Sequence, residues 1–173
     1  MKIIQTRDYK SQLMALYMDS FAKGASEQYI DELALETYIE KLLKEGVALV
    51  AIENNDVIGA LLSCPLAFDE YVTSEITENF AVEKCVYIAE MMVATQARGK
   101  GIGRQLLTAF FESTETKQYS DAFIRVWDKN VAAIALYEKI GFVAYTTIEQ
   151  TKQKADGIGT FVMQKIYLHK KLI

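Results

Sequence analysis

Apolar residues recur every three to four positions in two stretches near the start of the chain. The first series, which predicts a helix over residues 8–22, consists of Leu13, Leu16, Tyr17 and Phe21. The second series runs from Ile30 to Leu42 at the same spacing. We expect this second helix to begin with Ser26 as its N-cap, because a serine hydroxyl can accept a hydrogen bond from a free amide of the first turn. Gly46 is expected to end it.

Short apolar runs dominate the rest of the chain and predict strands. These runs cover residues 2–6, 47–52, 57–63, 85–93, 122–126, 142–146 and 160–168. Polar residues 53–56 separate the second run from the third, as a hairpin turn would. Further helices are expected over 101–117 and 131–140, and a long loop or short helix over 65–83. This mixture predicts an α/β domain of the mixed α+β kind, in which helices cover a mixed sheet.

The composition narrows the class of protein. A chain of 173 residues is near the usual size of one domain, so a single domain over residues 1–173 is expected. Hydrophobic residues make up 51% and charged residues 24%, a balance that excludes intrinsic disorder. The net charge of −4 lacks the basic footprint of a nucleic-acid-binding protein. No apolar run reaches the roughly 18 residues of a membrane span, and residues 1–9 lack a signal-peptide core, so a cytoplasmic protein is expected.

Cysteine and histidine are scarce. Cys64, Cys85 and His169 are the only residues of these two types, and they cannot supply the four ligands of a structural zinc site. His169 lies four residues from the end of the sequence, which argues against Ser-His-Asp or Cys-His catalysis. We interpret both cysteines as reduced core thiols and expect no metal.

The strongest motif is the glycine loop Arg98-Gly99-Lys100-Gly101-Ile102-Gly103, between an expected strand and an expected helix. Glycines let the backbone turn tightly and approach a ligand closely, and the free amides of a helix N-terminus favour an anion such as pyrophosphate. A plain glycine turn that connects the strand to the helix is the simpler alternative. Such a turn needs only one or two glycines, whereas this loop has three alternating glycines among basic residues. A Walker A loop needs Ser or Thr where Gly101 stands, and the dinucleotide fingerprint needs glycine where Arg104 stands.

A second motif begins twenty-seven residues after the last of these glycines. Asn130 precedes an alanine-rich helical run that ends at Gly141, and it suits an N-cap that also offers its side-chain amide to a ligand. Tyr137 lies about two turns further along the same face. A plain cap and a half-buried aromatic residue are the simpler alternatives for Asn130 and Tyr137.

Taken together, residues 87–93, the glycine loop and residues 130–142 resemble the GNAT superfamily of acetyl-CoA-dependent N-acetyltransferases. The family's loop pattern, Arg/Gln-x-x-Gly-x-Gly/Ala, is matched by Arg98, Gly101 and Gly103. Its later pattern, Asn-x-x-Ala-x-x-Leu-Tyr-x-x-x-Gly-Phe, is matched at every fixed position by Asn130, Ala133, Leu136, Tyr137, Gly141 and Phe142. The family often has a proline where this chain has Thr95, a departure that concerns a turn and not the ligand amides.

The resemblance implies a mostly antiparallel sheet of about seven strands, splayed between the fourth and fifth strands and flanked by about four helices. It also implies acetyl-CoA as cosubstrate and direct acetyl transfer to an amine in a ternary complex. Tyr137 would protonate the departing thiolate. The expected acetyl-CoA-binding residues are Met91, Met92, Val93, Arg98, Gly99, Lys100, Gly101, Ile102, Gly103, Arg104, Asn130 and Ala133.

Glu90 is the candidate base that accepts the proton of the attacking amine. It lies three residues before Val93, where the acetyl group is expected, and its neighbours in the run 88–93 are apolar. An isolated carboxylate in a strand buried on both faces calls for a functional explanation. The alternative is an ordinary charge on a half-exposed strand.

The acceptor is the least determined part of this interpretation. Residues 65–83 contain five acids, Asp69, Glu70, Glu75, Glu78 and Glu83, and no Lys or Arg. With three interleaved aromatic residues, they could attract a small cationic amine such as a polyamine or an aminoglycoside-like sugar. A solvated surface loop is the simpler alternative. The expected partner is this small-molecule amine; a homodimer stays open, and neither nucleic acid nor a membrane is expected.

Three other functions remain as alternatives: an acetyltransferase that acts on protein or peptide amines, a non-catalytic CoA-binding regulatory module, and a phosphate-binding α/β protein of another family. The presence of both Tyr137 and Glu90 favours an enzyme over the regulatory module.

Overall fold

The structure is a computed structural model that describes residues 1–23 and 26–173. Its seven strands form one sheet in the order β1-β2-β3-β4-β5-β7-β6. Only β4 and β5 pair in parallel, and the other neighbours are antiparallel. The mixed, mostly antiparallel sheet is therefore confirmed. The strands are β1 (Lys2–Gln5), β2 (Val47–Glu53), β3 (Asp56–Pro65), β4 (Cys85–Val93), β5 (Asp121–Trp127), β6 (Val143–Gln153) and β7 (Thr160–Lys171).

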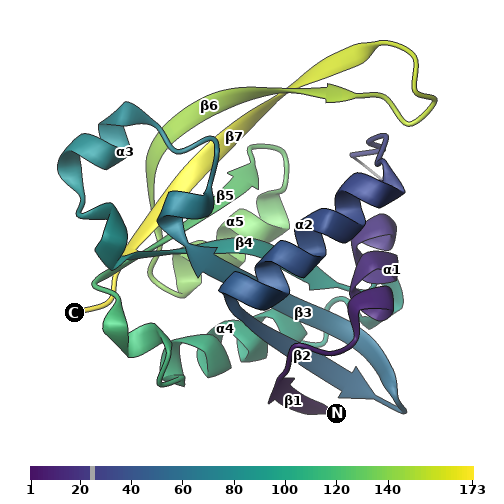
Figure 1. Cartoon of the computed structure of the whole chain (residues 1–173), viewed down its shortest axis with the longest axis horizontal. Helices are drawn as coiled ribbons and strands as arrows, with labels where there is room; N and C mark the ends of the chain where they lie inside the picture. The colour runs from purple at the N-terminus through teal and green to yellow at the C-terminus, as the bar shows by residue number, and fades with distance from the viewer. Residues whose placement is uncertain (24–25) are drawn as a thin grey trace.

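Helices cover both faces of this sheet: α1 and α2 lie on one face and α4 and α5 on the other (Figure 1). The helices are α1 (Lys10–Phe21), α2 (Glu32–Glu45), α3 (Ser74–Asn79), α4 (Ile102–Glu112) and α5 (Val131–Lys139). Helix α3 brings the number of helices to five in the part of the chain that the structure describes, where about four were expected. It lies inside the segment expected to be a loop or short helix, and the Thr73 hydroxyl caps it by accepting a hydrogen bond from the Ile76 amide. None of the helices of the described residues is long and apolar enough to cross a membrane.

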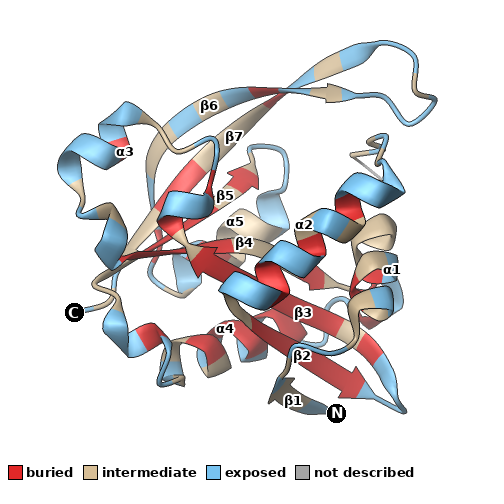
Figure 2. Cartoon of the chain, in the orientation of Figure 1, coloured by how far each residue is buried: buried red, intermediate tan, exposed pale blue. Residues whose placement is uncertain are grey.

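The hydrophobic core lies between the central strands and these helices (Figure 2). Strand β3 is apolar on both faces because a helix layer covers each of them, and Leu61 and Leu62 are both fully buried. The hairpin between β2 and β3 forms as expected. Asn54 and Asn55 occupy its turn with positive φ, a conformation that asparagine tolerates well.

Two helix boundaries differ from the sequence-based expectation. Helix α2 begins at Glu32 rather than near Ser26, because the Asp31 side chain accepts a 2.8 Å hydrogen bond from the Ala34 amide and serves as the N-cap. Helix α4 ends at Glu112 rather than near residue 117. The following Ser113 has extended backbone angles, and its hydroxyl donates to the Phe110 carbonyl.

The last two strands are longer than their apolar runs predicted. Strands β6 and β7 form a long hairpin that extends past the rest of the sheet toward the start of α2 (Figure 1). There, Gln28 forms a bridge with Lys154, and the Tyr29 amide donates to the Gln153 carbonyl. This contact explains why residues 26–31 are not helical: their backbone pairs with the hairpin instead.

Candidate active site

Strand β4 carries a bulge at the point where the sheet opens. Ser63 pairs with Ile88 and Leu62 pairs with Glu90, so Ala89 is an extra residue on β4. A bulge of this kind re-aims the side chains that follow it. As a result Tyr87 and Glu90, three positions apart, both line the same cavity.

The splay begins at the same position. Strands β4 and β5 pair only from Cys85 with Asp121 to Ile88 with Ile124. Residues 89–93 therefore leave their β5-facing edge without a strand partner, and the expected splay between the fourth and fifth strands is confirmed. This open edge includes Met91, Met92 and Val93, the strand residues expected to hold acetyl-CoA through their backbone.

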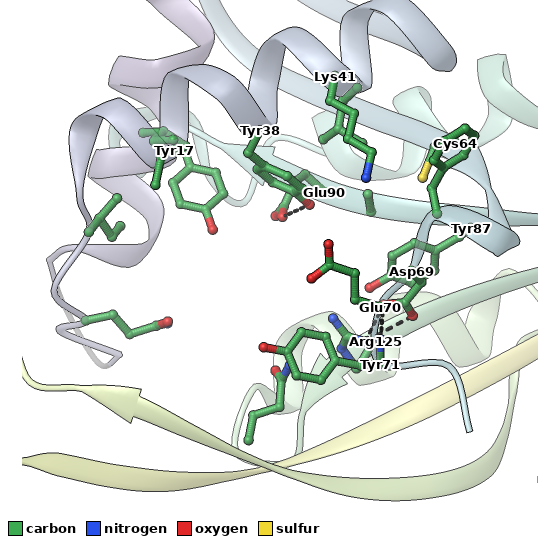
Figure 3. Close-up of a pocket in the computed structure, with 18 of the residues that line it drawn as sticks. Tyr17, Tyr38, Lys41, Cys64, Asp69, Glu70, Tyr71, Tyr87, Glu90 and Arg125 are labelled. Atoms are coloured by element: carbon green, nitrogen blue, oxygen red, sulfur yellow. Dashed lines mark hydrogen bonds and ion pairs between the residues drawn. The ribbon is translucent and has the colours of Figure 1, made fainter. Parts of the chain in front are cut away.

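A cavity of about 480 Å³ lies on the α1–α2 side of the splay. Its walls come from α1, residues 28–31, α2, the loop after β3, and strands β4, β5 and β6 (Figure 3). Six aromatic residues contribute to them: Tyr17, Tyr29, Tyr38, Phe68, Tyr71 and Tyr87. The volume and the apolar walls with a few polar groups are typical of small-molecule sites.

Glu90 is the carboxylate at the splayed end of this cavity. Its Oε1 accepts a 2.9 Å hydrogen bond from the Tyr38 hydroxyl (Figure 3). Burial raises the pKa of Glu90 to about 7, although the Tyr38 hydrogen bond and the charges of Lys165, Arg125 and Lys152 act in the opposite direction. A carboxylate poised near neutral pH can both accept and release a proton under physiological conditions.

The acidic loop does not form the rim that its composition suggested. Only Asp69 and Glu70 of its five acids line the cavity. Asp69 is buried and pairs with Arg125 at 2.8 and 3.0 Å, and it accepts a 2.6 Å hydrogen bond from Tyr167. In this buried network the Asp69 charge is paired with Arg125 inside the protein, and the attraction of a cationic acceptor by the loop stays a prediction.

The glycine loop lies at the end of β4, before α4. Gly99 and Gly101 have φ of 77° and 76°, which side-chain-bearing residues rarely adopt, and Gly101 is the N-cap of α4. The Arg98 side chain donates from Nε to the Val93 carbonyl at 3.1 Å and ties the loop to the strand end. Within the described residues, none of the amides from Gly99 to Arg104 donates a hydrogen bond to the protein. Such a row of free amides at a helix N-terminus fits the pyrophosphate of CoA.

Gly103 has a different role from the two glycines before it. A Cβ atom at this position would lie 2.9 Å from Met91 Cε and 3.2 Å from Leu136 Cδ2. Gly103 therefore lets α4 pack closely against β4 and α5. This packing holds Ile102 and the first turn of α4 beside the open strand edge.

Helix α5 carries the second motif. Asn130 is its N-cap, and its Oδ1 accepts from the Ala133 amide at 3.3 Å, so its structural role is the cap. Tyr137 is 5% exposed and packs edge-on against Phe142. Within residues 1–23 and 26–173, its hydroxyl has no hydrogen-bond partner. Burial, and next the Glu90 charge, raise the pKa of Tyr137.

Several cavity residues were missed from the sequence. Arg125 is an isolated charge in the apolar run 122–126, the same signal that singled out Glu90, so it could have been found. Tyr38 carried no such signal, because tyrosine fits any amphipathic helix. Gln150 and Lys152 lie in a polar stretch of β6 that had no periodicity to interpret.

Comparisons with known proteins agree with this geometry. The acetyltransferase (GNAT) family profile matches residues 10–142. An N-alpha-acetyltransferase of Saccharolobus solfataricus is 28% identical over 130 residues, which cover 74% of each chain. The uncharacterized N-acetyltransferase YobR of Bacillus subtilis is 36% identical over 55 residues, which cover 32% of this chain and 22% of that protein.

Solved structures share the whole fold. A ribosomal-protein-alanine N-acetyltransferase from Brucella melitensis superimposes with a TM-score of 0.73 at 23% identity over 99% of both chains. The acetyltransferase-like protein YncA from Salmonella typhimurium, solved with its cofactor acetyl-CoA, superimposes with a TM-score of 0.71 at 17% identity over 100% of this chain and 95% of that one. With a family match over most of its length, this chain belongs to the GNAT acetyltransferase family and is an acetyl-CoA-dependent N-acetyltransferase.

Proposed function

We propose that the protein acetylates the primary amine of a small molecule bound in the 480 Å³ cavity, with Glu90 as the base. The observation that carries this proposal is the position of Glu90. Its side chain enters the cavity where β4 and β5 separate, and its pKa of about 7 suits proton transfer.

The attacking amine must be neutral before it can react. A lysine-like amine has a pKa of about 10.4, so its neutral form costs about 4–5 kcal/mol at pH 7. Acetyl-CoA supplies an activated thioester when it is bound. The amine nitrogen forms the new bond to the acetyl carbon, the carbon–sulfur bond breaks, and the amine proton passes to the Glu90 carboxylate, directly or through a water.

Tyr137 is suited to the opposite proton transfer. Its hydroxyl keeps its proton at neutral pH, because burial raises the pKa of Tyr137 further above 7. We assign it the role of protonating the thiolate that leaves. The free amides of Gly99 to Arg104 and the open edge of residues 91–93 would hold the CoA moiety.

Direct transfer is favoured over a covalent acetyl-enzyme. Cys64 is the thiol in the cavity wall, and burial raises its pKa to about 12. A thiol with that pKa stays protonated at neutral pH and is a poor nucleophile. Intersecting initial-rate patterns, with no isotope exchange between acetyl-CoA and CoA in the absence of acceptor, are expected for this mechanism.

The test of the proposed function is a pH–rate profile for thiol release with a panel of small amines. Glu90→Gln should lower kcat by about 10²–10⁴-fold and remove the acidic limb near pH 7. Part of the rate should return at high pH, where the amine is already neutral. Glu70→Gln is the matched control, because Glu70 is an exposed carboxylate of the same cavity. An unchanged acidic limb in Glu90→Gln would remove Glu90 from the mechanism.

A further inference from the structure

The cavity wall contributed by β5 and β6 presents hydrogen-bond donors, and a lysine of β7 lies on the same face of the sheet beside it. Gln150 and Lys152 alternate along one face of β6 and both line the cavity. Lys165 of β7 pairs with Ile148, which places it on the same face of the hairpin, and its charge is close enough to lower the pKa of Glu90. Arg125 completes this wall from β5.

Gln150 is the residue of this wall that the protein leaves unsatisfied. It is 4% exposed, and its Nε2 is enclosed without a hydrogen-bond partner anywhere in residues 1–23 and 26–173. Burying an amide donor without an acceptor is unfavourable, and native structures rarely keep such a group without a ligand or a water. The donor therefore indicates a bound group that supplies an oxygen.

The Glu90 charge acts on both lysines from a distance and raises their pKa values. Neither Lys152 nor Lys165 has a carboxylate within ion-pair distance in the described part of the chain, and the Arg125 charge is already used by Asp69. Burial, and next the Lys152 charge, lower the pKa of Lys165 to about 8. Burial and the Arg125 charge lower the pKa of Lys152. Partly buried lysines that repel each other in this way would be stabilised by an anion.

We infer that the acceptor is a small zwitterion: a primary amine that also carries a carboxylate or another anionic oxygen group. Its amine faces Glu90, and its anionic group accepts from Gln150 beside Lys152 and Lys165. This inference rests on the proposed function and names the substrate class of the same site. It replaces the cationic acceptor that the acidic loop suggested, because Asp69 of that loop is occupied by Arg125.

A matched acceptor panel tests the inference. The intact protein is assayed with acetyl-CoA and several amino acids, each beside its carboxamide and its decarboxylated amine. We expect kcat/KM for the free carboxylate to exceed both counterparts by about tenfold or more, as charge-assisted hydrogen bonds allow. The carboxamide has the lower amine pKa and therefore the larger neutral fraction at neutral pH, so its comparison with the carboxylate is biased against the inference. A comparison of kcat/KM for β-alanine and for 2-aminoethylphosphonate shows whether the site prefers a carboxylate or a phosphonate as the anionic group.

Variants of the wall provide the second test. Gln150→Leu, Lys152→Gln and Lys165→Gln should each raise KM for the carboxylate-bearing acceptor by about tenfold. Loss of either lysine charge also raises the pKa of Glu90, which changes kcat alike for both members of a matched pair. The same variants should leave KM for the decarboxylated amine unchanged. Lys154→Gln is the matched control, since Lys154 is exposed two positions beyond Lys152 and does not line the cavity.

The outcomes separate the two proposals. If decarboxylated amines or polyamines are acetylated at the same rate as the zwitterions in a Glu90-dependent manner, the proposed function stands and the inference is overturned. Preferential acetylation of peptide N-termini would overturn both, because the proposed acceptor is a small molecule. Equal KM changes for both members of a matched pair would also overturn it. If acetyl-CoA binds but no amine of any class is acetylated, the proposed function fails and the inference fails with it.

Discussion

The Tyr38 hydroxyl donates a 2.9 Å hydrogen bond to Glu90 Oε1, and this bond joins α2 to β4 across the end of the cavity. The bond stabilises the ionised carboxylate and so opposes the effect of burial on the pKa of Glu90. Burial itself, followed by the Glu90 charge, raises the pKa of Tyr38, so this hydroxyl acts only as a donor. Helix α2 thereby takes part in setting the pKa of the proposed base.

Removing this hydroxyl should move the pH dependence of the enzyme. Tyr38→Phe takes away a hydrogen bond to the charged form, so the pKa of Glu90 should rise above 7. The acidic limb of the kcat/KM profile should move to higher pH by about half a unit to one unit. Tyr29→Phe is the control, because Tyr29 lines the same cavity without a bond to Glu90. If the plateau of kcat/KM fell while the acidic limb stayed at the same pH, Tyr38 would matter for packing alone.

The glycine loop should bind acetyl-CoA through its backbone more than through its side chains. Gly101→Val forces a branched side chain into a positive φ, and Gly103→Leu drives one into Met91 and Leu136. Both should weaken acetyl-CoA binding by at least about tenfold in calorimetry, whereas Lys100→Ala should change it by about threefold or less. In the unaltered protein, acetyl-CoA at a hundred times Kd should add about 2.7 kcal/mol of stability. No rise in Tm at saturating acetyl-CoA would contradict the assignment of this site.

Tyr137 should matter for turnover and not for cofactor affinity. Tyr137→Phe removes only the hydroxyl and keeps the packing against Phe142. We expect kcat to fall by about 10²–10⁴-fold while Kd for acetyl-CoA stays within about twofold. Stopped-flow thiol release measures the first quantity, and calorimetry the second. Tyr145→Phe on β6 serves as the control, and full activity of Tyr137→Phe would show that the thiolate leaves without this acid.

Asp69 should be a stability residue. The Asp69 side chain is 2% exposed and that of its partner Arg125 is 13% exposed, so Asp69→Asn leaves a buried guanidinium without its counter-charge. Urea unfolding should show a loss of about 3–5 kcal/mol. Glu78→Gln, at an exposed position of α3, should stay within about 0.5 kcal/mol. An Asp69→Asn protein of normal stability, with a raised KM for cationic amines only, would instead return Asp69 to the role that its loop suggested.

The elements that the sequence predicted correctly depend on local interactions. The turn at Asn54 and Asn55, strand β4 and the two motif helices form from the conformational preferences of adjacent residues. The glycine loop could be predicted for the same reason, because a positive φ at Gly101 and free amides at the start of a helix depend only on a short segment. Glu90 stood out because a single carboxylate interrupted an apolar run.

The tertiary structure alone decided what surrounds Glu90. The bulge at Ala89 arises from the pairing of β4 with β3, and it determines that Glu90 shares a cavity with Tyr87. Asp69 and Arg125 are 56 residues apart in the chain and meet only when the loop after β3 packs on β5. The β6–β7 hairpin extends over the cavity. It is stabilised by the pairing of its two strands and by contact with residues 28 and 29, and no apolar periodicity in the sequence predicts either interaction. Long-range pairing of polar strands leaves no signature in local periodicity, so the cluster of Gln150, Lys152 and Lys165 is found only in the folded chain.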